Sequence, residues 1–105
     1  MELTMRRTCD AGPVQYEGTI DGRPFYFRAR HDGWSFAVAV TLDDAIDVSS
    51  FDLASISGTL PNGAFLRAAK WGDEPEAASY MPFAEAERII RTCAEEYVDA
   101  AECDA

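Results

Sequence analysis

Hydrophobic and polar residues alternate along the first half of the chain, which is the pattern of half-buried β-strands. Residues 14–20 (VQYEGTI), 25–31 (FYFRARH) and 34–40 (WSFAVAV) follow it. Asp21-Gly22 and Asp32-Gly33 separate the three runs, and Asp-Gly is a strong signal for a two-residue hairpin turn. The spacing therefore predicts an antiparallel meander of three strands.

The alternation also assigns the residues of the second and third runs to two faces of the predicted sheet. One face comprises Phe25, Phe27, Ala29, Trp34, Phe36, Val38 and Val40. The opposite face comprises Tyr26, Arg28, Arg30, Ser35, Ala37 and Ala39.

Residues 42–58 (LDDAIDVSSFDLASISG) fit no single pattern. Their aspartates favour the start of a helix or an irregular loop, and a short strand around residues 53–60 is an alternative. The turn signal Leu-Pro-Asn-Gly at residues 60–63 is followed by residues 65–71 (FLRAAKW), which predict a further strand.

The clearest helix is predicted over residues 83–101, which contain neither glycine nor proline and follow Pro82, a residue suited to a first helical turn. At 100° per residue, the apolar side comprises Ala86, Ile89, Ile90, Cys93, Ala94, Tyr97 and Ala101. The polar side comprises Glu85, Arg88, Arg91, Glu95, Glu96, Asp99 and Glu102. We expect the apolar side to dock on the sheet.

These elements predict an α+β fold: an antiparallel meander sheet of three to five strands packed by a C-terminal α-helix. The length of 105 residues indicates a single domain. Within it, residues 1–12 show neither pattern and can be a flexible N-terminal segment. Residues 13–72 are mainly β, and residues 80–102 are helical.

The charge is strongly negative and unevenly distributed. The chain has 19 acidic and nine basic residues, for a net charge of −10, and ten of the acids fall within residues 73–105. Aromatic residues make up 11%, which is too many for a disordered acidic tail. Residues 1–9 show no signal peptide and no apolar run reaches the ~18 residues of a membrane span, so we expect a cytoplasmic protein.

The sequence offers no catalytic pattern, and we expect no enzyme, no cofactor and no metal. His31 is the sole histidine and follows a predicted strand at a turn. Cys9, Cys93 and Cys103 lack the paired spacing of a zinc site, and we expect reduced thiols with Cys93 in the core. A divalent-metal hydrolase using Asp43, Asp44 and Asp47 is an alternative, although their spacing does not match a calcium loop.

Direct binding of a nucleic acid is a further alternative. Tyr26 lies between Arg28 and Arg30 on one strand face, and aromatic and basic residues together can stack and neutralise single strands. The net charge of −10 opposes this, because phosphate contacts supply most of the affinity. We expect these arginines to pair with the acids of the chain itself.

The acidic surface suggests that the protein imitates a polynucleotide. Glu95, Asp99 and Glu102 repeat at i, i+4 and i+7, which places three carboxylates in a row along one helix. Such an anionic row attracts the basic surface of a DNA-binding protein. The residues that we expect to bind the partner are Asp43, Asp44, Asp47, Asp73, Glu74, Glu76, Glu95, Glu96, Asp99 and Glu102.

Residues 16–34 (YEGTIDGRPFYFRARHDGW) and 80–83 (YMPF) resemble small proteins of proteobacteria and their phages, and acidic anti-CRISPR inhibitors of type I systems. Some of those inhibitors are DNA mimics. The resemblance implies a target in the host: a CRISPR effector subunit, at the basic surface that reads the protospacer-adjacent duplex. It implies that target-DNA binding is blocked by competition, and it carries over no catalytic residue.

The alternative function is an interaction domain that binds a protein partner through aromatic residues, with the acids serving solubility alone. Its anchors would be Tyr26, Trp71, Tyr80 and Phe83, because aromatic residues dominate interface hot spots.

Overall fold

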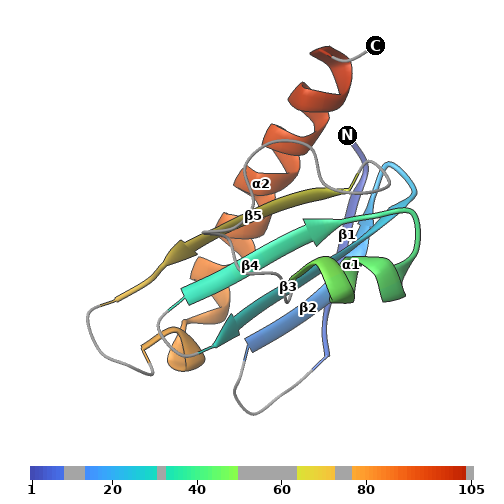
Figure 1. The fold of residues 1–105 in the computed structure, drawn as a ribbon. Helices are drawn as coiled ribbons and strands as arrows, with labels where there is room; N and C mark the ends of the chain where they lie inside the picture. The colour runs from blue at the N-terminus through green and yellow to red at the C-terminus, as the bar shows by residue number, and fades with distance from the viewer. Residues whose placement is uncertain (9–13, 31–32, 50–63, 73–76, 104–105) are drawn as a thin grey trace.

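The computed structural model describes residues 1–8, 14–30, 33–49, 64–72 and 77–103, and for residues 47–49 and 101–103 it describes the backbone only. Figure 1 shows strands and helices in one layered unit. In chain order the elements are β1 (Leu3–Arg7), β2 (Val14–Ile20), β3 (Arg23–Arg30), β4 (Gly33–Val38), α1 (Leu42–Ser49), β5 (Phe65–Lys70), the 3₁₀ helix η3 (Ala77–Tyr80) and α2 (Phe83–Cys103).

The five strands form one antiparallel sheet in the order β1-β2-β3-β4-β5, so the predicted α+β meander with a C-terminal helix is confirmed. Asp21 (φ 50°) and Gly22 (φ 87°) join β2 to β3 with two positive φ angles, as in a type I′ hairpin turn. At the next hairpin Gly33 belongs to β4, where it pairs with Arg30, rather than to the turn predicted at Asp32-Gly33.

Three local features differ from the sequence pattern or extend it. β1 lies within the N-terminal segment for which no strand was predicted, because its pair Arg6 and Arg7 hides the alternation. Val40 lies beyond β4 and is 60% exposed, so the prediction that it continues the face of Trp34, Phe36 and Val38 was wrong. Residues 42–49 form the short helix α1, and the possible strand at residues 53–60 lies outside the described residues.

The main core lies between the sheet and α2. Its largest fully buried side chains are Tyr16, Ile20, Phe25, Phe27, Phe36, Val38 and Ile90. The rings of Phe25 and Phe36 stack with their centroids 5.4 Å apart, and the Phe65 ring meets Tyr97 of α2 edge to face at 5.4 Å. The predicted assignment of β3 and β4 residues to two faces is therefore correct, except at Val40.

α2 presents the predicted apolar stripe to this core. Buried on it are Ala86, Ile89, Ile90, Cys93 and Ala94. Two further contacts fix the helix: the hydroxyl of Tyr16 donates a 2.9 Å hydrogen bond to Glu87, and the Arg7 guanidinium lies 4.2 Å from the centre of the Phe83 ring. The orientation of α2 about its own axis is thus set by both apolar and polar contacts.

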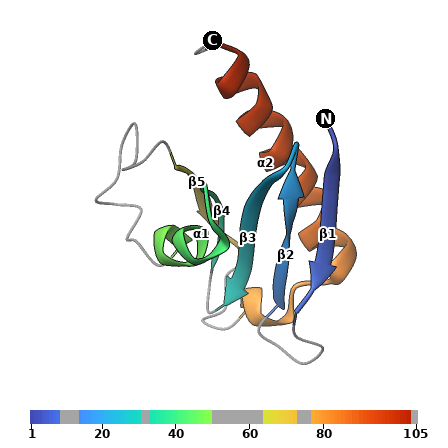
Figure 2. The same ribbon diagram turned by 90° about the vertical axis from the view of Figure 1, so that its right-hand side faces the viewer.

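α1 covers the opposite face of the sheet, so the sheet lies between two helices (Figure 2). A second, smaller core forms there from Tyr26, Ala37, Ala39, Ala45, Ala64 and Leu66, with Leu42 packed against it. α1 packs on β3 and β4, and the β1–β2 half of this face carries polar residues instead. Thr41 begins α1 as its N-cap, because its hydroxyl accepts a 3.1 Å hydrogen bond from the Asp44 amide.

Gly18 of β2 permits the close approach of β1 and generates the first testable prediction. A Cβ atom at this position would lie 1.9 Å from the Thr4 carbonyl oxygen and 2.7 Å from the Phe25 ring. We expect Gly18→Ala to lower the free energy of unfolding by about 1–3 kcal/mol, the usual cost of overpacking. Urea unfolding measures the change.

The matched control is Gly22→Asn in the β2–β3 turn, where an added Cβ meets no atom within 4 Å and asparagine tolerates the positive φ. We expect this variant to stay within about 0.5–1 kcal/mol of the parent. Equal losses in the two variants would contradict the packing argument.

Candidate functional site

The second half of α2 carries a cluster of exposed acids. Glu95, Glu96 and Asp99 are all exposed; Glu95 and Asp99 lie on the side of the helix opposite its buried stripe, and Glu96 lies on the flank next to β5. No lysine or arginine follows Arg91 in the chain. In Figure 1 this end of the helix extends past the end of the sheet. We call Glu95, Glu96 and Asp99 the acidic end of α2.

One member of the acidic end is paired. Arg67 of β5 donates to the Glu96 carboxylate at 2.9 Å, and its guanidinium also lies 4.2 Å from the centre of the Phe65 ring. Both partners are about half exposed, so the pair contributes little net stability. Among the described residues, no ion pair or side-chain hydrogen bond engages Glu95 or Asp99.

The first half of α2 differs, because its carboxylates are engaged locally. Arg88 pairs with Glu85 one turn away, and this contact holds the pKa of Glu85 below its usual range. Glu87 accepts the hydrogen bond from Tyr16, whose own pKa burial raises to about 12, so that the phenol stays a donor at neutral pH. The free anionic charge of α2 therefore lies after Arg91.

The free carboxylates lie in the C-terminal half of their helix, with Asp99 about one turn and Glu95 about two turns before its end at Cys103. The C-terminus of an α-helix carries a partial negative charge, which repels acidic side chains and attracts basic ones. α2 has no basic residue in its last turn. Glu95 and Asp99 also repel each other, since they are four residues apart on one face. Local helix energetics thus do not explain the acidic end.

The aspartates of α1 have the opposite setting. Asp43 and Asp44 lie in the first turn of α1, where the helix dipole stabilises negative charge, and both are exposed. α1 and α2 lie on opposite faces of the sheet (Figure 2). The structure therefore does not bring Asp43 and Asp44 alongside the acidic end of α2, and it gives them a local structural role.

The remaining expected contact residues are only partly described. Asp73, Glu74 and Glu76 lie outside the described residues. Asp47 and Glu102 are placed by their helical backbone, in α1 and α2 respectively. His31 and Cys9 also lie outside the described part of the chain.

The four expected aromatic anchors have very different exposures. Tyr26 is 7% exposed beneath α1, which removes it as a stacking platform for bases or as an interface anchor. Trp71 and Phe83 are partly buried against the main core. Tyr80, at the end of η3, is 82% exposed and is the aromatic side chain available to a partner.

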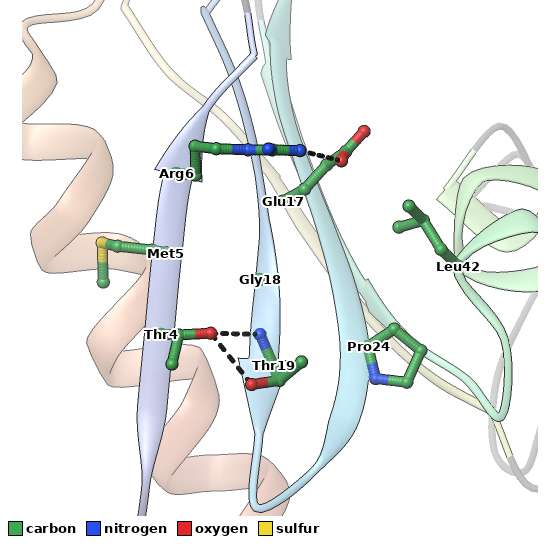
Figure 3. Close-up of a pocket in the computed structure, with 8 residues that line it drawn as sticks. All are labelled: Thr4, Met5, Arg6, Glu17, Gly18, Thr19, Pro24 and Leu42. Atoms are coloured by element: carbon green, nitrogen blue, oxygen red, sulfur yellow. Dashed lines mark hydrogen bonds and ion pairs between the residues drawn. The ribbon is translucent and has the colours of Figure 1, made fainter.

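Sequence reasoning did not find a pocket on the α1 side of the sheet, because β1 forms part of it. The pocket has a volume of about 350 Å³. It is lined by Thr4, Met5, Arg6, Glu17, Gly18, Thr19, Pro24 and Leu42. Figure 3 shows Leu42 of α1 and Pro24 of β3 on one side, facing the polar residues of β1 and β2 on the other. We call it the sheet-face pocket.

Three observations bear on a reactive cysteine, a metal site and a membrane span. Burial raises the pKa of the Cys93 thiol to about 12, so this cysteine is a neutral core residue as expected. Within the described ranges, no three histidine, cysteine, aspartate or glutamate residues are grouped to hold a metal ion. The helices of the described residues are also not apolar and long enough to cross a membrane.

Comparison of the chain with protein-family models, with curated protein sequences and with solved structures found no match.

The position of Asp99 generates the second prediction. Asp99→Lys replaces a repulsion from Glu95 with an i, i+4 attraction in the favourable order, and it places a cation near the helix C-terminus. We expect the free energy of unfolding to rise by about 0.5–1 kcal/mol. Urea unfolding of this variant and of the isosteric Asp99→Asn, which removes only the repulsion and should gain less, tests the expectation. A loss of stability in both would show that Asp99 stabilises the fold.

Proposed function

We propose that the protein imitates the backbone of a nucleic acid and occupies a cationic DNA-binding surface of another protein. The acidic end of α2, together with the following Glu102, makes the contact. The protein blocks DNA by competition and performs no chemistry. The observation that carries the proposal is that Glu95 and Asp99 are exposed on one face of α2 and have no internal partner among the described residues.

The density of charge on α2 supports this proposal. Glu95, Glu96, Asp99 and Glu102 lie within about 10.5 Å of helix axis at 1.5 Å per residue. Their mean spacing along the axis is ~3.5 Å, compared with one phosphate charge for every ~1.7 Å of duplex axis. A rigid helix therefore presents a charge density of the same order as DNA.

The exposure of these acids supports it as well. Glu95 and Asp99 do not have to break contacts with internal partners before they meet a guanidinium or ammonium group. The rigid helix also needs no ordering on binding. The weak pair between Arg67 and Glu96 can exchange for a stronger contact at little cost. Acids in such a position give a fast, salt-sensitive association with a basic surface.

The resemblance of residues 16–34 and 80–83 to acidic anti-CRISPR proteins identifies the target to test first: the subunit of a type I CRISPR effector complex that binds the protospacer-adjacent duplex. The proposed site of action is the cytoplasm of a bacterial host. In this proposal the aspartates of α1, on the opposite face of the sheet, stabilise their helix and add to the long-range field.

The third prediction tests this function with purified type I effector complexes and a labelled target duplex. We expect the parent chain to inhibit duplex binding, and the double variant Glu95→Gln, Asp99→Lys to lose inhibition at least tenfold. The inhibition by the parent should weaken as salt rises from 50 to 300 mM, because screening shortens the reach of exposed charges.

The control variant is Thr8→Lys, Ala69→Lys, Ala84→Lys, which changes the net charge by the same three units at exposed positions outside the acidic end. It should inhibit within about twofold of the parent. Equal inhibition by the parent and the α2 variant, or no inhibition of any type I complex, would disprove the proposal.

A second candidate function, the aromatic interaction domain, is favoured by one observation: Tyr80 is 82% exposed beside the buried Met81. Tyr80→Ala distinguishes the two functions, because it removes that anchor without touching the core. We expect inhibition to be unchanged in this variant, and a loss of tenfold or more with little salt dependence would instead support the aromatic surface.

A further inference from the structure

The sheet-face pocket exists because α1 covers only part of its side of the sheet. α1 packs on β3 and β4, and β1 and β2 continue beyond it without a covering helix among the described elements. A pocket therefore forms beside α1. Leu42 and Pro24 form its apolar wall, and the polar side chains of β1 and β2 form its floor (Figure 3).

The floor contains one carboxylate that is well placed to receive a cation. The Glu17 side chain is 24% exposed, and its carboxylate accepts a hydrogen bond from Arg6 at 3.3 Å. The Arg6 side chain is 78% exposed, so the guanidinium can leave Glu17 and return to water easily. Glu17 is thus the fixed half of this pair and Arg6 the replaceable half.

Neutral hydroxyl groups line the same floor as the carboxylate. The Thr4 and Thr19 hydroxyls lie 2.9 Å apart on the same floor, and Thr4 also accepts a hydrogen bond from the Thr19 amide. Asp43 and Asp44 directly follow Leu42 and are exposed. The pocket thus combines an apolar wall, hydroxyl oxygens and the carboxylate of the Arg6–Glu17 pair.

We propose that the sheet-face pocket binds the side chain of an arginine or lysine from the basic partner. The methylene stem would lie against Pro24 and Leu42, and the charged head would take the place of Arg6 at the Glu17 carboxylate. Such side chains readily divide in this way, with an apolar stem on an apolar surface and a hydrated or paired head. The identity of the partner rests on the proposed function, but the chemistry of the pocket does not.

The size of the pocket suits this occupant. Its volume of about 350 Å³ lies at the lower end of the range for small-ligand sites, ~300–1,000 Å³. A pocket of this volume has room for one long side chain. The Glu17 carboxylate repels an anionic ligand once Arg6 has been displaced.

The fourth prediction uses the isolated chain and two small probes, butylguanidinium and butyrate, titrated by NMR. We expect butylguanidinium to shift the resonances of Thr19 and Leu42 and butyrate to leave them unchanged. Glu17→Gln should weaken butylguanidinium binding at least fivefold, because it removes the charge and keeps the shape. Arg6→Ala should strengthen it about threefold, because it removes the internal competitor.

The two variants are expected to change the affinity for butylguanidinium in opposite directions. A damaged fold would weaken binding in both variants, so a folding defect cannot produce this result. The unfolding midpoint in urea provides the check on folding. Preference for butyrate, weaker binding in Arg6→Ala, or full binding in Glu17→Gln would overturn the proposal. Failure of inhibition in the effector assay, with probe binding intact, would disprove the proposed target and leave the pocket standing.

Discussion

The aromatic layer between the sheet and α2 is the constraint on which the rest of the structure depends. Phe25, Phe27 and Phe36 are completely buried under the helix, and truncating one such ring typically costs about 3–5 kcal/mol. Because Ile90 and Ala94 must face these rings, Glu95 and Asp99 must face away from them. The position of the exposed carboxylates is therefore a consequence of packing, and it does not rely on any polar contact that a partner would have to break.

Much of this arrangement could be predicted from the sequence, because strong periodic patterns and Asp-Gly turns are local signals. The Asp21-Gly22 turn between β2 and β3 and the buried stripe of α2 are of this kind. β1 could not be predicted, since the arginines that end it obscure its alternation and its pairing with β2 is a tertiary effect. The site beside it was missed for the same reason: the pocket needs Thr4 and Arg6 on a strand.

The covering of the second face of the sheet by α1 could also not be predicted from local sequence patterns. The ambiguous segment at residues 42–58 gave no indication of which face it would cover, because small residues such as Ala37 and Ala45 fit either setting. Residues 42–49 fold as α1 against Tyr26, and this has two consequences for function. It removes Tyr26 from the surface, and it separates the aspartates of α1 from the acidic end of α2 by the thickness of the sheet.

Composition alone therefore says less about function than the position of each charge. Asp43 and Asp44 stand where a helix start stabilises them, Glu85 and Glu87 have partners, and Glu96 has Arg67, so structural reasons cover most described acids. Glu95 and Asp99 are different, because they repel each other and have no basic partner among the described residues. Residues that lower stability without a structural benefit are typical of functional surfaces, where activity is retained at the expense of stability. If replacing those two carboxylates leaves binding of the partner unchanged, the net charge of this protein serves only its solubility.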